Sequence, residues 1–321
     1  MNPTELAKQS ALKSSKPAVY DKVIKYGMRI VRIEPYYTCN MHCLHCCIRE
    51  FQVPQERRAM TIEDIRNIAE QAHELGFSQF VISGGEPLMY PDFDDIVKAI
   101  DPAKFWITTD TNGWFMDAER AKHLKSIGVD KVQLSIDSTE YGKHDQFRQK
   151  PGAYKRAMEA IGHIRNAGLK LIIQTVVDKR RAHHAELIDF LQTFKKMDVP
   201  VYIGYAKPVG AWKGHYEVML DQNDIDFVEG LAKEYSAFTH LTPNYGWPGG
   251  CIAMKRMINV TKYGDVNPCP VMQEFSIGNI FKEPLVDIIA RGDKQFAGHI
   301  PTCIMATDRD FVDGRFYGLD A

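Results

Sequence analysis

The sequence predicts an α/β protein in which a parallel sheet with outer helices is followed by a small, irregular C-terminal unit. Strand-like and helix-like segments alternate through the first two thirds of the chain, and Gly76, Gly128 and Gly168 each separate a helix from the next strand. Glycine suits these positions because it ends a helix in the left-handed conformation and lets the chain turn. At roughly 150 residues per domain, the 321 residues allow about two domains.

Six segments have the apolar runs or the apolar–polar alternation of strands, at residues 29–35, 77–83, about 105, 131–136, 169–177 and 201–206. Between them, apolar residues recur at helical spacing over 62–75, up to about residue 127, and over 154–167 and 185–197. Thr61 to Asp64 form the pattern of a capping box before the first of these helices. Such alternation predicts a parallel sheet. The spacing favours a barrel or partial barrel, with a flat doubly wound sheet as the alternative.

The alternation stops near residue 210. Aromatic, glycine and proline residues concentrate between residues 242 and 251, and one clear helical pattern follows, at 284–289. We therefore expect an N-terminal extension over 1–28, a barrel over 29–215, a linker helix over 216–239 and a small domain over 240–321. A domain this small usually needs a covalent or metal staple.

Composition excludes several classes of protein. A hydrophobic fraction of 45% is enough for a sizeable core, and 40 basic against 41 acidic residues give a net charge of −1. Nucleic-acid binding usually shows as a basic excess. No apolar run approaches the ~20 residues that span a bilayer, and residues 1–17 lack the apolar stretch of a secretory signal. We expect a soluble cytoplasmic protein with no nucleic-acid or membrane partner.

The seven cysteines fall into two groups, four between residues 39 and 47 and three in the last quarter of the chain. Cys39, Cys43 and Cys46 have the spacing C-x3-C-x2-C directly after the first expected strand. Three thiolates on one loop can bind three irons of a cubane cluster and leave the fourth iron open. A structural zinc site completed by His42 or His45 is the alternative.

This cysteine loop, followed by Ser83-Gly-Gly-Glu-Pro87 at the end of the second strand, resembles the radical S-adenosylmethionine enzymes. The resemblance covers most of the chain and implies a six-stranded (β/α)6 partial TIM barrel with a [4Fe-4S] cluster on Cys39, Cys43 and Cys46. In that family S-adenosylmethionine binds the open iron. Its reductive cleavage gives a 5′-deoxyadenosyl radical that abstracts hydrogen from the substrate.

The resemblance extends to other strand ends. It implies an S-adenosylmethionine site built from Gly84, Gly85, Glu86, Ser135, Arg148 and Gln174. For the last three, the alternatives are a strand-end serine, a surface salt bridge and a buried, hydrogen-bonded glutamine. Cys47 is either an inert thiol beside the cluster or, as the one catalytic candidate, a hydrogen-atom donor of the kind known in radical epimerases.

Cys251, Cys269 and Cys303 form the second pattern. The segment from Cys251 to Cys269 resembles the start of the SPASM extension of these enzymes, and a hairpin turning at Lys262–Asp265 would bring its two cysteines to one end. Only Cys303 follows, which matches the shortened Twitch form and implies one auxiliary [4Fe-4S] cluster. Zinc is the alternative metal. The fourth iron is either open or bound by a non-cysteine group, with these candidates: His299, Asp308 and Asp310.

The sequence therefore predicts a radical enzyme that oxidises or activates a C–H bond of a small polar metabolite in cofactor or natural-product biosynthesis. The 28 residues before the first strand are few for a peptide-recognition domain, which favours a small molecule over the alternative, a peptide- or protein-modifying maturase. Flavodoxin or ferredoxin is the expected reductant. Alternatives from other classes are a non-catalytic iron–sulfur electron-transfer protein and a zinc-stapled binding protein.

Aromatic and cationic residues near strand ends and in the linker are the candidates for substrate contact, with packing as their ordinary role. They are Tyr36, Tyr37, Trp114, Tyr205, Lys207, Trp212, Lys213, His215, Asn244, Tyr245 and Trp247.

Overall fold

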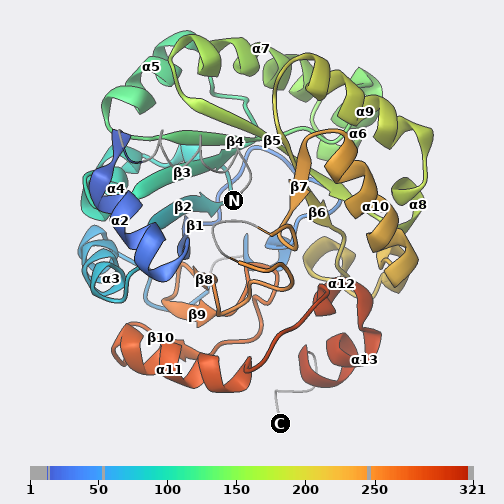
Figure 1. Cartoon of the computed structure of the whole chain (residues 1–321). Helices are drawn as coiled ribbons and strands as arrows, with labels where there is room; N and C mark the ends of the chain where they lie inside the picture. Colours follow the sequence, from blue (N-terminus) through green and yellow to red (C-terminus); the bar gives the residue numbers. More distant parts are fainter. Residues whose placement is uncertain (1–12, 14, 53–54, 244–246, 317–321) are drawn as a thin grey trace.

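The structure is a computed structural model that describes residues 13, 15–52, 55–243 and 247–316. All six expected strands are present in it. They are parallel and pair in chain order, and they form a curved wall: β1 (Ile30–Tyr36), β2 (Gln79–Gly84), β3 (Trp106–Thr111), β4 (Lys131–Ser135), β5 (Lys170–Val177) and β6 (Val201–Tyr205). Figure 1 looks along this wall and shows the helices on its outer side. The partial barrel is confirmed.

The helices that cover the wall follow the strands in the chain. They are α3 (Ile62–Glu74), α4 (Phe93–Ile100), α5 (Ala118–Ser126), α6 (Tyr141–Arg148), α7 (Ala153–Asn166), α8 (Lys179–Ala182), α9 (Ala185–Lys196) and α10 (Gln222–Glu234). Their apolar faces are buried against the strands; α3, for example, buries Ile65, Ile68, Ala69 and Ala72. The expected capping box at the start of α3 is present, since Thr61 and Asp64 bind each other's backbone N–H groups.

Both edges of the six-stranded wall are extended by strands from the second half of the chain. β7 (Ala237–Thr239) pairs with β6, and β8 (Met257–Val260) pairs with β1, both in parallel. Within residues 216–239, where the sequence suggests a linker helix, α10 is thus followed by a strand. This strand supplies partners for backbone groups that β6 would otherwise leave unpaired at an edge. The described strands form one continuous ten-stranded sheet.

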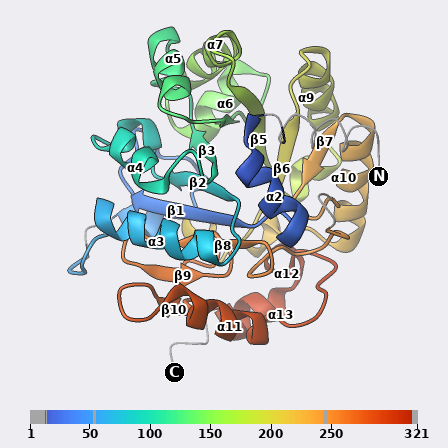
Figure 2. The same cartoon turned by 60° about the vertical axis from the view of Figure 1, so that its left-hand side comes forward.

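The expected hairpin between Cys251 and Cys269 is also confirmed. β8 pairs antiparallel with β9 (Asp265–Asn267), and the Gly264 N–H closes the turn on the Thr261 carbonyl at 2.9 Å. β10 (Gly278–Asn279) and α11 (Leu285–Gln295) follow, and α11 is longer than the sequence pattern indicates. Two short helices, α12 (Ile304–Thr307) and α13 (Arg309–Phe311), and the π-helix η5 (Val312–Phe316) complete the described segment. Figures 1 and 2 place α11 to α13 beyond β8–β10, on one side of the barrel.

The N-terminal helix α2 (Pro17–Tyr26) lies against the ends at which the strands begin. Lys16 donates to the Phe105 carbonyl, just before β3, at 2.8 Å and to Asp130, just before β4, at 2.5 Å. Lys22 donates to the Phe77 carbonyl, just before β2, at 3.1 Å. Figure 2 shows α2 in front of the strands. These contacts cover the end of the barrel opposite to the cysteine loop. In the described part of the chain, no helix combines the length and hydrophobicity needed to cross a bilayer.

We expect the Thr61→Ala variant to have a free energy of unfolding lower by about 1 kcal/mol, because the N-cap side chain is lost. Denaturant unfolding measures this change. Ser126→Ala is the matched control, because its hydroxyl bonds only to a carbonyl of its own helix, α5, and makes no cap. Equal losses in the two variants would contradict a specific contribution from the capping box.

Candidate functional site

A cavity of about 410 Å³ runs through the barrel and is lined by all seven cysteines. It extends from residues at strand starts, such as Gln79 and Lys131, to residues at strand ends, such as Gly84 and Ser135. Four thiols come from the loop after β1, and Cys251, Cys269 and Cys303 come from the C-terminal segment. The two groups of cysteines, about two hundred residues apart in the sequence, therefore share one cavity.

The loop that carries the first cysteines is held by the end of β2. The Gly85 and Glu86 N–H groups donate to the Tyr36 and Thr38 carbonyls at 3.0 and 2.9 Å. A Cβ atom on Gly84 would lie 2.2 Å from the Tyr36 oxygen, and one on Gly85 would lie 2.0 Å from the Thr38 oxygen. The two glycines are required because the cysteine loop packs directly onto their backbone.

Glu86 is buried, and its carboxylate accepts three hydrogen bonds from the protein. The donors are the Thr111 hydroxyl at 2.6 Å, the Asn112 N–H at 2.8 Å and the Leu88 N–H at 3.2 Å. Burial raises the pKa of Glu86 to about 7, against the opposing effect of these donors. Glu86 thus joins the ends of β2 and β3, and it lines the cavity next to the cysteine loop.

Arg148, at the end of α6, connects a buried ion pair to the cysteine loop. Its guanidinium binds Asp137 through Nε and a terminal nitrogen at 2.7 and 2.6 Å, and its other terminal nitrogen lies 3.7 Å from the Cys43 sulfur. Burial alone would raise the pKa of Asp137, but the guanidinium lowers it to about 2. The alternative for Arg148, a salt bridge on the surface, is wrong, because only 9% of its side chain is exposed.

Ser135 and Gln174 stand side by side, because they are register partners on β4 and β5. Both line the cavity. The Gln174 side chain accepts a hydrogen bond from Gln133, two residues before Ser135 on the same face of β4. The neighbouring strands β4 and β5 thus present one hydroxyl and two amides to the cavity.

The thiols of both groups are held in a low-dielectric environment. Burial raises the pKa of Cys39 and Cys269 to about 11, and that of Cys46 and Cys251 to about 12, with further increases from neighbouring thiols. A thiolate is a metal ligand only when positive charge compensates for such burial. This donor set therefore suits a cationic metal centre.

Of the two histidines of the cysteine loop, His45 lines the cavity and His42 does not. His42 is exposed, and the His45 ring stacks on Phe147 with 4.6 Å between centroids. Cys47 lines the cavity, and burial raises its pKa to about 11, against the opposing effect of Arg32. Among the described residues, no three His, Cys, Asp or Glu side chains are grouped as ligands of a single metal ion.

Main-chain hydrogen bonds bring the C-terminal cysteines to the cavity. The Cys251 N–H donates to the Ile300 carbonyl at 2.8 Å, which ties the segment before β8 to the segment before Cys303. Cys269 follows β9 directly. Three expected candidates for a fourth ligand do not line the cavity: His299 and Asp310, which are exposed, and Asp308, which caps α13.

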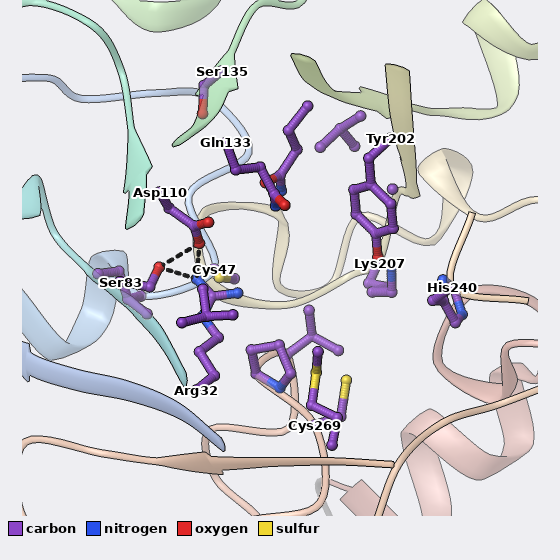
Figure 3. Close-up of a pocket in the computed structure, with 18 of the residues that line it drawn as sticks. Arg32, Cys47, Ser83, Asp110, Gln133, Ser135, Tyr202, Lys207, His240 and Cys269 are labelled. Atoms are coloured by element: carbon purple, nitrogen blue, oxygen red, sulfur yellow. Dashed lines mark hydrogen bonds and ion pairs between the residues drawn. The ribbon is translucent and has the colours of Figure 1, made fainter. Parts of the chain in front are cut away.

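Several polar residues of the cavity wall were missed by the sequence analysis. Arg32 on β1 lies 3.4 Å from Asp110 on β3, and both bind the Ser83 hydroxyl (Figure 3). Tyr202 on β6 and His240 after β7 line the opposite wall. The alternation of residues along each expected strand could have indicated them, because every second side chain of a barrel strand faces inward.

Of the substrate candidates, Tyr205, Lys207 and Trp212 line the cavity. Tyr36 binds Asp92, and Tyr37 packs on Tyr263. The remaining described candidates are bound away from the cavity wall, and two others lie outside the described residues. The first set contacts residues outside the cavity: Trp114 (with Lys150), Lys213 (with Glu274), His215 (with Glu217) and Trp247 (with Gly250). The two candidates outside the described residues are Asn244 and Tyr245.

Two family descriptions match this chain. Residues 33–191 match the Radical SAM superfamily, and residues 251–300 match SPASM, an iron-sulfur cluster-binding domain. The first match contains the cysteine loop and the ends of β2 to β5. The second contains Cys251 and Cys269 and ends before Cys303.

Two curated relatives match over most of their length. The AdoMet-dependent heme synthase of Nitratidesulfovibrio vulgaris is 23% identical over 293 residues, which cover 81% of this chain and 78% of the relative. The PqqA peptide cyclase of Streptomyces rochei is 27% identical over 278 residues, which cover 80% and 74%.

Among solved structures, Streptococcus suis SuiB bound to its precursor peptide SuiA superposes with a TM-score of 0.64 at 17% identity, covering 85% of this chain and 68% of SuiB. SuiB bound to S-adenosylmethionine gives a TM-score of 0.62 at 17% identity, covering 93% and 71%. These likenesses show the fold.

We expect Gly85→Ala to lower the free energy of unfolding by about 1–3 kcal/mol, because the added methyl group overlaps the Thr38 carbonyl and forces backbone to move. Gly142→Ala on α6 is the control, since a Cβ there meets nothing within 4 Å and alanine is the better helix former. Denaturant unfolding of both variants measures the difference. If Gly85→Ala were as stable as the parent, the packing of the cysteine loop on β2 would be wrong.

Proposed function

The chain belongs to the radical SAM superfamily and carries a SPASM-type iron–sulfur domain, and from this premise we propose that it oxidises or activates a C–H bond of a small polar, anionic metabolite in a biosynthetic pathway. It is an enzyme that uses iron–sulfur clusters and S-adenosylmethionine. The observation that carries the choice of substrate is the set of polar atoms without partners in the cavity that both cysteine groups line.

The donor chemistry of the cavity fits two [4Fe-4S] clusters. Cys39, Cys43 and Cys46 would hold one, and Cys251, Cys269 and Cys303 the auxiliary one. When bound, the first cluster supplies the electron that cleaves S-adenosylmethionine to a hydrogen-abstracting 5′-deoxyadenosyl radical. A low-potential donor such as flavodoxin or ferredoxin would deliver that electron.

The residues around the first cysteine group have distinct roles in this proposal. The guanidinium of Arg148 faces the Cys43 sulfur at 3.7 Å, so its positive charge stabilises a thiolate ligand there. Gly84 and Gly85 let the cysteine loop approach β2, and Glu86 fixes the ends of β2 and β3. Ser135 and Gln174, side by side at neighbouring strand ends, would bind the polar groups of S-adenosylmethionine.

A polar substrate is supported by buried atoms without hydrogen-bond partners. Arg32 Nε and Asp110 Oδ1, whose side chains line the cavity, are such atoms among the described residues, and Glu34 Oε1, whose side chain does not line it, is another. Arg32 Nε and Glu34 Oε1 lie 3.7 Å apart, which is too far for a hydrogen bond. Because a buried polar atom without a partner costs about 1–3 kcal/mol, a ligand with matching donors and acceptors gains affinity by binding here.

An anionic group on the substrate is supported by Lys207. Its ammonium donates to the Tyr205 carbonyl, and it forms no ion pair with a carboxylate within the described ranges of the chain. Its charge acts on Cys47 from the first cysteine group and on Cys251 and Cys269 from the second. A carboxylate or phosphate bound to Lys207 would therefore place the substrate between the two groups.

A peptide substrate is the second candidate. The peptide cyclase relative and the superposition with SuiB in its peptide complex favour it. The small molecule is favoured by Arg32 Nε and Asp110 Oδ1 on the cavity wall, because buried polar atoms without hydrogen-bond partners suit a compact polar ligand.

We expect the protein reconstituted without oxygen to hold roughly eight irons, and the Cys39/Cys43/Cys46→Ala variant to hold about four, as two cubanes predict. Only the parent should form 5′-deoxyadenosine under strong reductant. Iron, sulfide and nucleoside assays measure these quantities. A parent that contains zinc alone, or that cleaves no S-adenosylmethionine, would exclude the proposed function.

A metabolite extract can be limited to molecules below about 1 kDa and passed over an anion exchanger. We expect the retained, anionic fraction to increase the formation of 5′-deoxyadenosine at least several-fold. Lys207→Ala should lose this increase while it retains its iron, because the anion loses its countercharge. Lys213→Ala is the control, since Lys213 pairs with Glu274 outside the cavity. Stimulation by the peptide fraction alone would favour the second candidate instead.

A further inference from the structure

The auxiliary cysteine group has three thiols, whereas a cubane cluster has four irons. The fourth position is therefore either open or occupied by a residue that the sequence pattern does not reveal. The three non-cysteine candidates from the sequence, His299, Asp308 and Asp310, do not line the cavity.

We propose that His240 is the fourth protein ligand of the auxiliary cluster, an inference that rests on the proposed assignment of Cys251, Cys269 and Cys303. His240 follows β7 directly and lines the same cavity as the three thiols. The Gly250 N–H donates to the Leu241 carbonyl at 3.2 Å. This bond places the backbone of His240 and Leu241 alongside that of Gly250 and Cys251.

A ring contact also ties His240 to this part of the cavity. The His240 and Tyr205 rings meet edge to face with 5.5 Å between centroids, and the Tyr205 hydroxyl is held by Glu229 at 2.6 Å. Burial is the main cause that raises the pKa of Tyr205, and the nearby Cys303 adds to it. His240 thus lies on the same wall of the cavity as two of the three cysteines. Figure 3 shows His240 beside Lys207, on the side of the cavity away from Arg32 and Asp110.

The imidazole of His240 is available as a ligand. Its ring is half-buried and makes no hydrogen bond within the described part of the chain. The other acidic and histidine side chains that line the cavity belong to the first cysteine loop, to the end of β2 or to β3. Glu86 binds Thr111 and Asn112, Asp110 binds Ser83, and His45 stacks on Phe147.

Three thiolates and one imidazole make a complete ligand set. No iron would then be left open for the substrate, which would be held by side chains such as Lys207 instead. Replacing a thiolate by a neutral imidazole raises the reduction potential of an iron–sulfur cluster. His240 would therefore make the auxiliary cluster a better electron acceptor than one with four cysteines.

Pulsed EPR of the full-length Cys39/Cys43/Cys46→Ala protein tests this inference, because that protein retains only the auxiliary cluster. We expect the EPR signal of the reduced cluster to show strong hyperfine coupling to a nitrogen. This coupling should change from that of 14N to that of 15N when the protein is labelled with histidine that carries 15N in its ring. The coupling should be lost in His240→Ala and retained in His299→Ala, whose exposed imidazole lies near Gly250. The His240→Cys variant should hold an auxiliary cluster of four irons that shows no nitrogen coupling. The reduction potential of this cluster should be lower than that of the cluster with His240.

The outcomes separate this inference from the proposed function. A cluster on Cys251, Cys269 and Cys303 without histidine coupling, or with coupling that persists in His240→Ala, would overturn the role of His240 and leave the proposed function intact. Coupling lost in His299→Ala instead would assign the ligand to His299. A protein that assembles no second cluster would contradict both.

Discussion

The parallel pairing of β8 with β1 is the interaction on which the site depends. Its register places Ile30 opposite Met257 and Ile33 opposite Val260, so the C-terminal segment enters the sheet directly beside the strand that leads into the first cysteine loop. One edge of the barrel is thereby covered, which protects backbone groups of β1. The same pairing helps to give both cysteine groups a common cavity, because the first group follows β1 whereas Cys251 precedes β8 and Cys269 comes after the antiparallel strand β9.

The polar interior is the second determinant of function. Arg32 and Asp110 are 19% and 14% exposed, and Arg148 and Asp137 are 9% and 5% exposed. All of these side chains except Asp137 line the cavity. Pairs this buried add little to stability, since the cost of desolvation offsets the attraction. Their positions are better explained by the ligands they can bind. Arg148 contacts Cys43 of the cysteine loop, whereas Arg32, whose Nε has no hydrogen-bond partner among the described atoms, lines the cavity.

The two ends of the barrel are covered by different parts of the chain. At the end where strands begin, Lys16 and Lys22 of helix α2 bind carbonyls that precede β2 and β3, and these contacts hold the helix against the barrel. At the other end, the glycines after β2 admit the cysteine loop so closely that no side chain fits. The first cysteine group lies at this second end, where other parallel barrels carry their catalytic residues, because the loops that follow the strands can vary without disturbing the strand pairing.

The sequence by itself determined the six strands, the capping box at Thr61, the hairpin turn before Asp265 and the cysteines of both groups. These features depend on local periodicity and spacing, which a single chain segment contains. Only the tertiary structure decided that β7 and β8 extend the barrel, that Arg148 reaches Cys43, and that His240 shares a wall with Cys251. Such contacts join residues far apart in the sequence, and strand pairing and burial select them, so no local pattern encodes them.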